Sequence, residues 1–139
     1  MIITKEFVFD AAHKLMREDW SDEQNADVFG KCFSLHGHTY RLQVSVKGPV
    51  DAGGMVINFT DLSQIVKEEI ITYFDHKYLN ELPDFLSRPP TCEHFALVIF
   101  GKLNPLISKE KIRLETVVLF ETPTSWARLE REDYEQSIR

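Results

Sequence analysis

Apolar and polar side chains alternate along two segments of the chain. In the first segment, residues 2–13, four apolar residues share one parity with a histidine at the end: Ile3, Phe7, Phe9, Ala11 and His13. In the second segment, one face carries two histidines followed by apolar side chains: His36, His38, Tyr40, Leu42, Val44 and Val46. Alternation with a period of two predicts β-strands with one buried face. If the two strands pair antiparallel, the end of the first meets the start of the second, and three imidazoles converge at one edge of the sheet.

In the middle of the chain, the spacing of apolar residues changes from a period of two to a period of about 3.6. Residues 59–74 show this helical spacing, and Asn58 before them is a favourable N-cap. A second helix is predicted over about 92–103, with Thr91 at its start and Asn104-Pro105 at its end. Two amphipathic helices are therefore available to cover one face of a sheet.

Two further strands are predicted in the C-terminal part of the chain. Residues 111–121 alternate, and the apolar positions of one parity are Ile112, Leu114, Val118 and Phe120, while Glu121 has the opposite parity. The sequence Thr122-Pro123-Thr124 breaks this strand, and residues 125–129 predict a short fourth one. The charged residues 130–139 predict either a tail or a fraying helix.

The element order ββααββ predicts the α+β class, with an antiparallel sheet and two helices on one of its faces. Residues 14–31 are polar and predict a long irregular loop, in which Trp20 and Phe29-Gly30 are the anchors. At 139 residues, the chain is long enough to bury a core, and we expect residues 1–139 to form a single domain.

Composition and charge exclude some classes of partner. The formal net charge of −6 argues against general binding to nucleic acid or to an anionic membrane, although a local basic pocket can still bind a small anionic substrate. No N-terminal apolar stretch has the length of a signal peptide or a membrane span. Cys32 and Cys92 form no C-x-x-C pair, so we expect free thiols and a cytoplasmic protein.

His13, His36 and His38 make a candidate metal site. Neutral imidazoles suit Zn²⁺, and three protein ligands leave the fourth position open, as catalytic zinc requires. A single histidine near an apolar strand is more often a packed or surface residue. The pair His36-x-His38 at a strand start, with a third histidine at the end of the expected partner strand, favours the metal site.

Other candidate residues have two or more interpretations from spacing alone. Cys32 is a fourth metal ligand, a reactive thiol or a small buried residue. Asp75-His76 is either a helix-terminal pair or a carboxylate-oriented imidazole that relays protons. Glu121 is either a solvated carboxylate or an anchor for the N–H groups of a flat heterocycle.

Thr91 and Glu93 are most simply a helix cap and an acid favoured by the helix dipole, and Cys92 between them is most simply structural. Lysines and arginines that could contact an anionic group are Lys14, Lys31 and Arg41. Lysines on loops are usually only solvated, so the sequence does not identify an anion site.

Five ordered blocks give the chain a resemblance to a known family. They are Phe9-Asp10-Ala11-Ala12-His13, Cys32-x3-His36-Gly37-His38, Asp75-His76-x2-Leu79-Asn80, Pro90-Thr91-x-Glu93 and Glu121-Thr122. Over about residues 5–127, the chain resembles the 6-pyruvoyl-tetrahydropterin synthase and 6-carboxy-tetrahydropterin synthase (QueD) family. Each block alone is weak evidence, whereas the ordered set is highly specific.

The resemblance implies a tunnelling fold (T-fold), in which subunits join their sheets into barrels, typically as homohexamers built from two trimers with active sites at the subunit interfaces. It also implies a role for each candidate residue. His13, His36 and His38 would hold Zn²⁺, Cys32 would be the catalytic base, and Asp75 and His76 would complete the proton relay. Glu121 would anchor the pterin, and Thr91 and Glu93 would line its pocket.

The resemblance further implies 7,8-dihydroneopterin triphosphate as the substrate. The carboxy branch releases acetaldehyde and triphosphate and serves queuosine biosynthesis, whereas the pyruvoyl branch keeps all side-chain carbons and leads to biopterin. The three residues between Cys32 and His36, and the run from Glu121 to Trp126, are similar to bacterial carboxy-type chains. The long segment between His13 and Cys32 is similar to the pyruvoyl type.

We therefore expect the carboxy-type enzyme, with the pyruvoyl-type enzyme as the alternative. A non-catalytic module that binds zinc or pterins is the third possibility. Asn58 and Cys92 stand where the family usually has Asp and Ser. Both Asn and Asp are good N-caps, so the first difference is expected to matter little.

Overall fold

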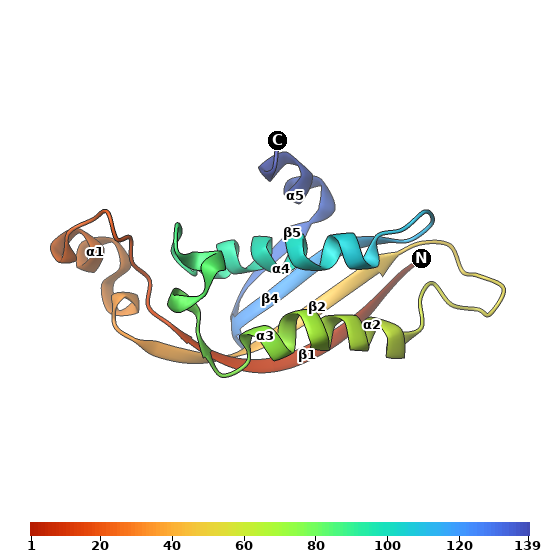
Figure 1. Ribbon diagram of the computed structural model, residues 1–139, viewed down its shortest axis with the longest axis horizontal. Coiled ribbons are helices and arrows are strands. Elements are labelled where there is room, and N and C mark those ends of the chain that lie inside the picture. The colour runs from red at the N-terminus through yellow and green to blue at the C-terminus, as the bar shows by residue number, and fades with distance from the viewer.

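The computed structural model describes residues 1–139 and contains one five-stranded sheet in the order β3-β1-β2-β4-β5. The strands are β1 (Ile2–His13), β2 (His36–Lys47), β3 (Lys77–Tyr78), β4 (Arg113–Thr122) and β5 (Ser125–Glu130). One face of the sheet is covered by helices, with α2 (Phe59–Val66) and α3 (Thr72–Phe74) over β1 and α4 (Cys92–Ile107) over β4 (Figure 1). The predicted α+β architecture is confirmed.

Strands β1 and β2 pair antiparallel along their whole length, as the alternation predicts. His13 lies opposite His36, and Ala11 lies opposite His38. The side chains of this parity, including Phe7, Phe9, Tyr40 and Leu42, are buried beneath the helices. The burial of one continuous apolar face fixes the register, because a slip by one residue would turn this whole face to solvent.

The first predicted helix is confirmed over residues 59–74. It consists of α2 (Phe59–Val66), a π-helical turn (Lys67–Ile71) and α3 (Thr72–Phe74). The side chain of Asn58 accepts a hydrogen bond from the backbone N–H of Thr60 at 2.8 Å, so the asparagine is a functional N-cap.

The second helix, α4 (Cys92–Ile107), extends four residues beyond the predicted end and includes Pro105. A proline removes one backbone hydrogen bond, but Leu103 and Ile107 are fully buried in the core. The burial of Ile107 therefore offsets the missing bond, and the prediction that Asn104-Pro105 ends this helix is wrong.

The prediction that residues 14–31 are irregular is correct for residues 14–21 and wrong for the rest, which contains the helix α1 (Asp22–Phe29). Ser21 and Gln24 form a capping box at its start: each side chain bonds the other's backbone N–H at 3.1 Å. A 3₁₀ turn (Gly30–Phe33) follows the helix and leads towards β2. The helix exposes most of its side chains, so the sequence carries almost no apolar periodicity there.

The predicted apolar face of the third strand is only partly correct. A register shift between Ser45 and Val46 lets Leu114 face the core together with Val117 and Leu119. Glu121 continues the parity of Val117 and Leu119, so its carboxylate lies on the helix-covered face. The short strand β3, which pairs parallel with β1, was not predicted and makes the sheet mixed rather than purely antiparallel. Two 3₁₀ turns (Leu79–Glu81 and Pro83–Phe85) join β3 to the segment before α4.

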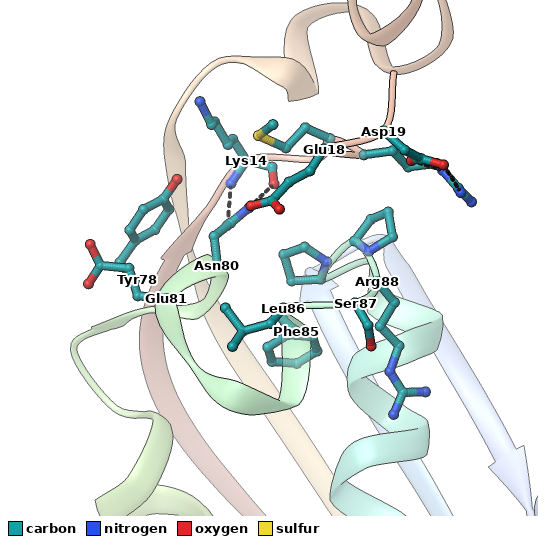
Figure 2. Close-up of a pocket in the computed structure, with 14 residues that line it drawn as sticks. Lys14, Glu18, Asp19, Tyr78, Asn80, Glu81, Phe85, Leu86, Ser87 and Arg88 are labelled. Atoms are coloured by element: carbon teal, nitrogen blue, oxygen red, sulfur yellow. Dashed lines mark hydrogen bonds and ion pairs between the residues drawn. The ribbon is translucent and has the colours of Figure 1, made fainter. Parts of the chain in front are cut away.

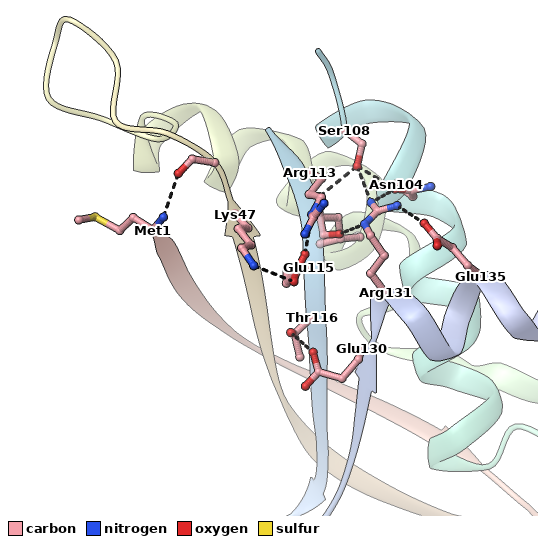
Figure 3. A network of polar contacts seen from close by, with 12 residues as sticks. Met1, Lys47, Asn104, Ser108, Arg113, Glu115, Thr116, Glu130, Arg131 and Glu135 are labelled. Carbon is pink, nitrogen blue, oxygen red and sulfur yellow. Dashed lines mark hydrogen bonds and ion pairs between the residues drawn. The ribbon is translucent and has the colours of Figure 1, made fainter. Parts of the chain in front are cut away.

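The C-terminal residues form the helix α5 (Arg131–Ser137), which Arg131 ties to the rest of the molecule (Figure 3). The guanidinium donates to the backbone carbonyl of Leu114 at 2.7 Å, to the Asn104 side chain at 2.6 Å and to the Ser108 hydroxyl at 2.8 Å. Of the two predicted alternatives, tail or helix, the helix is correct. None of the helices combines the length and the apolar character that crossing a membrane requires.

Replacing Arg131 by alanine should lower the free energy of unfolding by about 2–3 kcal/mol, because the hydrogen bonds of a largely buried guanidinium to Leu114, Asn104 and Ser108 are lost. The matched control is Arg128→Ala, whose exposed pair with Glu130 should contribute less than about 0.5 kcal/mol. Urea denaturation measures both values. Equal effects of the two substitutions would show that Arg131 does not hold α5 in place.

Candidate metal centre and active site

Three histidines form a compact cluster where β1 ends and β2 begins. One ring nitrogen from each of His13, His36 and His38 lies within 4.8 Å of the others, and the ring centroids are 4.6–5.1 Å apart. The paired strands place the rings on the same face, and His13 is fully buried. The predicted convergence of the three imidazoles is confirmed.

Two backbone carbonyls orient the imidazoles. The Nδ1 of His13 lies 2.9 Å from the carbonyl oxygen of Pro90, and the Nδ1 of His36 lies 2.7 Å from that of Ser34. A carbonyl can only accept, so in each neutral ring Nδ1 carries the proton and Nε2 keeps its lone pair. The two Nε2 atoms face each other at 3.0 Å. This arrangement is the outer-shell support that metal-binding histidines usually have.

The cluster fits a metal ion held by three imidazoles. The Nε2 of His38 is buried and has no hydrogen-bond partner. Burial lowers the pKa of His13 to about 4 and also lowers the pKa of His38, so both rings are neutral at physiological pH. A buried ring nitrogen without a partner, and neutral rings at His13 and His38, suit a divalent transition metal.

Cys32 lies apart from this donor set. It sits in the 3₁₀ turn before β2, is half-buried, and its Sγ is not among the atoms that lie within 4.8 Å of one another. The interpretation of Cys32 as a fourth ligand therefore finds no support, and the three histidines leave coordination positions open. Its backbone carbonyl accepts a hydrogen bond from Leu15 N–H at 2.8 Å, which joins the two ends of residues 15–32.

A hollow of about 320 Å³ adjoins the histidines and brings together the three residues expected to bind substrate. It is lined by Leu15, Thr91, Cys92, Glu93, Glu121, Ser125, Trp126 and Ala127. The Oε1 atom of Glu121 lies 3.5 Å from Nε2 of His13 and 3.6 Å from Nε2 of His38. Burial raises the pKa of Glu121, and the nearby His36 opposes this shift. The carboxylate thus links the hollow to the metal cluster.

Thr91 and Cys92, which line the hollow with Glu121, differ in whether their side chains can still donate a hydrogen bond. The Thr91 side chain accepts the backbone N–H of His94 at 3.2 Å as the N-cap of α4, which leaves its hydroxyl proton available. The Cys92 thiol donates to the carbonyl of Leu119 at 3.2 Å, and burial raises its pKa to about 12. Cys92 is therefore a neutral thiol with a structural role, as expected.

The sequence did not single out every residue of this site. Pro90 orients His13 through its backbone carbonyl, and no side-chain pattern can reveal that contact. Trp126 is 57% exposed and lines the hollow beside Glu121. A large aromatic residue shortly after the predicted turn at Thr122-Pro123-Thr124 was the available signal for it.

Asp75 and His76 form a pair, but they lie away from the hollow. Their side chains approach to 3.0 Å, and Asp75 also accepts the backbone N–H of Asp10 at 2.9 Å, which lowers the pKa of the carboxyl. His76 has φ +59°, a backbone conformation that is rare for a residue with a side chain. The interpretation as a carboxylate-oriented imidazole agrees with this geometry.

The Asp75–His76 pair lies beside the face of the sheet that the helices do not cover. His76 borders a hollow of about 550 Å³ whose lining also includes His38 of the cluster. The other lining residues Asp10, Ala12, Gly37 and Thr39 alternate along β1 and β2 with the histidines and therefore face away from the helices. Within one chain, the Asp75–His76 pair thus lies beside the helix-free face, and His38 is the cluster residue that borders the same hollow.

The three cations considered for anion binding do not converge. Arg41 pairs with Glu6 at 2.9 Å and stacks over Phe120 at 4.0 Å. Lys14 lines a separate cavity of about 510 Å³, shown in Figure 2, which excludes Glu121 and contains three carboxylates as well as Arg17 and Arg88. No contact joins Lys31 to Lys14 or Arg41, so these three cations do not form an anion site.

Comparisons with known proteins agree with this architecture. A family model described as 6-pyruvoyl tetrahydropterin synthase matches residues 2–132. A 6-pyruvoyl tetrahydrobiopterin synthase of Dictyostelium discoideum is 38% identical over 107 residues, which cover 76% of this chain and 79% of that protein. A 6-carboxy-5,6,7,8-tetrahydropterin synthase of Haemophilus influenzae is 34% identical over 146 residues, covering 89% and 94%. The solved structure of Caenorhabditis elegans 6-pyruvoyl tetrahydropterin synthase has a TM-score of 0.81 at 33% identity, covering 94% of this chain and 96% of that one.

The sheet, the helices on one face and the histidine cluster define a T-fold protein with a site that could bind a metal. The chain belongs to the 6-pyruvoyl tetrahydropterin synthase family, whose enzymes are lyase-type synthases of tetrahydropterins. The family resemblance that the ordered sequence blocks imply is confirmed.

The metal-free protein should become less stable as the pH falls from 6.5 to about 4. In this window the unfolded chain protonates His13 at its ordinary pKa of 6.5, whereas the buried ring stays neutral down to about 4. Unfolding then takes up protons, so the free energy of unfolding falls by roughly 2–3 kcal/mol and is fully restored above pH 6.5. Urea denaturation of the metal-free protein between pH 4 and 7.5 measures this dependence.

Two histidine variants separate this effect from general acid denaturation. His13→Gln should make the stability curve shallower, because one of the two histidines whose pKa is lowered by burial is gone while His38 remains. His76→Gln is the control for the loss of a histidine outside the buried cluster, because its side chain is 77% exposed. Identical curves for the wild type and His13→Gln would contradict the assignment.

Proposed function

We propose that the protein is a zinc-dependent 6-carboxy-5,6,7,8-tetrahydropterin synthase of queuosine biosynthesis. It would convert 7,8-dihydroneopterin triphosphate to the 6-carboxy product and release acetaldehyde and triphosphate. The observation that carries this choice is the short connection from Cys32 to His36. The 3₁₀ turn that ends at Phe33 enters β2 after only Ser34 and Leu35, and this spacing is similar to carboxy-type enzymes. The Haemophilus influenzae relative of that name, which is matched over 94% of its length, supports the choice.

In this proposal His13, His36 and His38 hold Zn²⁺ through their Nε2 atoms. Zinc, when bound, supplies a Lewis acid that acidifies the side-chain hydroxyls of the substrate. The carbonyls of Pro90 and Ser34 keep two of the rings in the tautomer that binds metal.

The hollow beside the histidines would hold the pterin ring. The Glu121 carboxylate would accept hydrogen bonds from the amino and ring N–H groups, and Thr91 and Glu93 would line the pocket. Because Glu121 lies within 3.6 Å of two histidine nitrogens, a ring anchored there places its side chain beside the zinc ligands. This proximity orients the bonds that react.

Cys32 would remove a proton from a side-chain carbon, and His76, held by Asp75, would relay protons to and from the substrate. The pair lies beside the helix-free face of its own chain, and in this proposal a second chain brings its His76 to the pocket. We therefore propose a homohexamer of two trimers, in which the sheets join into a barrel and each active site lies between subunits.

The alternative is 6-pyruvoyl-tetrahydropterin synthase, a carbon–oxygen lyase. Several relatives carry that name, among them the Dictyostelium discoideum protein. The long segment between His13 and Cys32, with its helix α1, is the feature of this chain that favours the alternative.

Identifying the products separates the two enzyme classes. The zinc-loaded protein should convert 7,8-dihydroneopterin triphosphate to a 6-carboxypterin and acetaldehyde in equal amounts, as measured by mass spectrometry and an aldehyde assay. A pterin that loses triphosphate but keeps its three side-chain carbons would assign the pyruvoyl reaction instead. An absence of turnover in the zinc-loaded protein would favour a non-catalytic module that binds zinc or pterins.

The shared active site predicts complementation between inactive variants. Cys32→Ala and His76→Ala should each lower kcat by about 10²–10⁴-fold, because each removes a proton-transfer group, while zinc content and oligomeric state stay unchanged. Co-expressed, the two variants should regain roughly a quarter of the wild-type activity, since that share of interfaces combines the two intact halves.

A pair on the same side of the interface provides the control. Cys32→Ala combined with Glu121→Gln should regain nothing if both residues of each site come from one chain. Equal recovery in both combinations, or none in either, would be incompatible with the proposed division of the site.

A further inference from the structure

Asn25 is unusual among the polar residues of this protein. Its side chain is 0% exposed, although it lies on α1 at the edge of the molecule rather than in the main core (Figure 1). Burying an amide is costly unless its donors and acceptor are satisfied, so a fully buried asparagine in a surface segment needs an explanation.

The Asn25 amide acts on the backbone of the preceding segment. Its Oδ1 accepts the N–H of Arg17 at 2.8 Å, and its Nδ2 donates to the carbonyls of Arg17 at 3.0 Å and Ser21 at 3.1 Å. Both backbone groups of Arg17 are thus held by one side chain. These hydrogen bonds satisfy backbone groups that a neighbouring strand would satisfy in a sheet. They therefore fix the conformation of a segment that lies outside the helices and strands.

A second asparagine holds the other end of the same segment. The amide of Asn80 accepts the N–H of Lys14 at 3.0 Å and donates to its carbonyl at 2.8 Å, as Figure 2 shows. Leu15, which lies between the two clamped residues, donates its N–H to the carbonyl of Cys32 at 2.8 Å. The fixed segment therefore holds the backbone of Cys32 directly.

We propose that Asn25 is a positioning residue for Cys32. By fixing Arg17 and Ser21, it holds residues 14–17 in the conformation in which Leu15 binds the Cys32 carbonyl. The thiol is thereby kept in place relative to the histidine cluster, whose first member, His13, directly precedes the segment. This role rests on the proposed function, in which Cys32 is the base.

A purely structural role for Asn25 makes a different prediction. Other contacts already support α1, namely the capping box of Ser21 with Gln24 and the stacking of Trp20 on Phe29 at 5.9 Å. If Asn25 only stabilised this helix, its loss would lower the amount of folded protein and leave kcat per folded molecule unchanged. If it positions Cys32, kcat must fall in protein that remains folded.

The experiment compares Asn25→Ala with Gln24→Ala in the zinc-loaded protein. Asn25→Ala should lower kcat by about 10²-fold with KM within about twofold, because a displacement of about 1 Å in a catalytic group has an effect of this size. Zinc content should not change. Gln24→Ala breaks the capping box on the same helix without touching the bonds of Asn25 and should leave kcat within about twofold.

A second measurement does not depend on turnover. Alkylation of Cys32 by iodoacetamide, followed by peptide mass spectrometry to distinguish it from Cys92, should be about threefold faster or more in Asn25→Ala, because the half-buried thiol loses its fixed surroundings. If the wild type shows no turnover, the proposed function fails, and the alkylation rate alone decides the role of Asn25.

Three results would overturn the inference: an unchanged kcat per folded molecule, an unchanged alkylation rate of Cys32, or the same loss of kcat in Gln24→Ala. If Asn25→Ala does not fold, Asn25→Asp replaces it. That variant keeps the shape and the acceptor for Arg17 but loses the amide donors, so kcat should still fall by about tenfold or more. An unchanged kcat in Asn25→Asp would equally overturn the inference.

Discussion

The antiparallel pairing of β1 with β2 is the constraint on which the metal cluster depends. Its register places His13 opposite His36 and Ala11 opposite His38, so the three imidazoles share one face and one end of the sheet. The apolar side chains along the same face bury themselves under α2 and α4, and this burial holds the register. The burial of apolar side chains that stabilises the core thus also brings the three histidines together. They meet at the end of the sheet where the core ends and polar side chains begin.

The strands bring the histidines together, but segments outside the sheet orient them. The carbonyl of Pro90, just before α4, fixes the His13 ring, and the Ser34 carbonyl fixes the His36 ring. Residues before α4 therefore contribute to the cluster through their backbone, while Thr91 and Glu93 line the adjacent hollow through their side chains. One helix start serves both the metal cluster and the proposed pterin pocket, which explains why the two are contiguous.

The parts of the structure that the sequence predicted are those governed by strict periodicity. Both long strands, the helical stretch over residues 59–74 and the meeting of His13 with His36 follow from spacing alone. Features that depend on tertiary contacts were missed: α4 passes Pro105 because Ile107 is buried, and a register shift brings Leu114 to the core. Likewise, α1 exposes most of its surface, so its capping box was the only local signal. For Asp75 and His76, their adjacency in the sequence could suggest a pair but could not reveal beside which face of the sheet the pair lies.

The position of Asp75 and His76 beside the helix-free face is the strongest structural argument for an active site that is shared between subunits. His76 adopts φ +59° and pairs with Asp75 beside the outward-facing residues of β1 and β2, whereas Glu121 and His13 lie beneath the helices and only His38 of the cluster borders the hollow beside His76. A sheet cannot transmit a proton through its own plane, because its backbone donors and acceptors are already paired between strands. Under the proposed roles, one chain supplies the zinc ligands, the pterin anchor and Cys32, and a neighbouring chain supplies the relay. Oligomerisation would then be a requirement of the chemistry as well as a means of covering the free edges of the sheet.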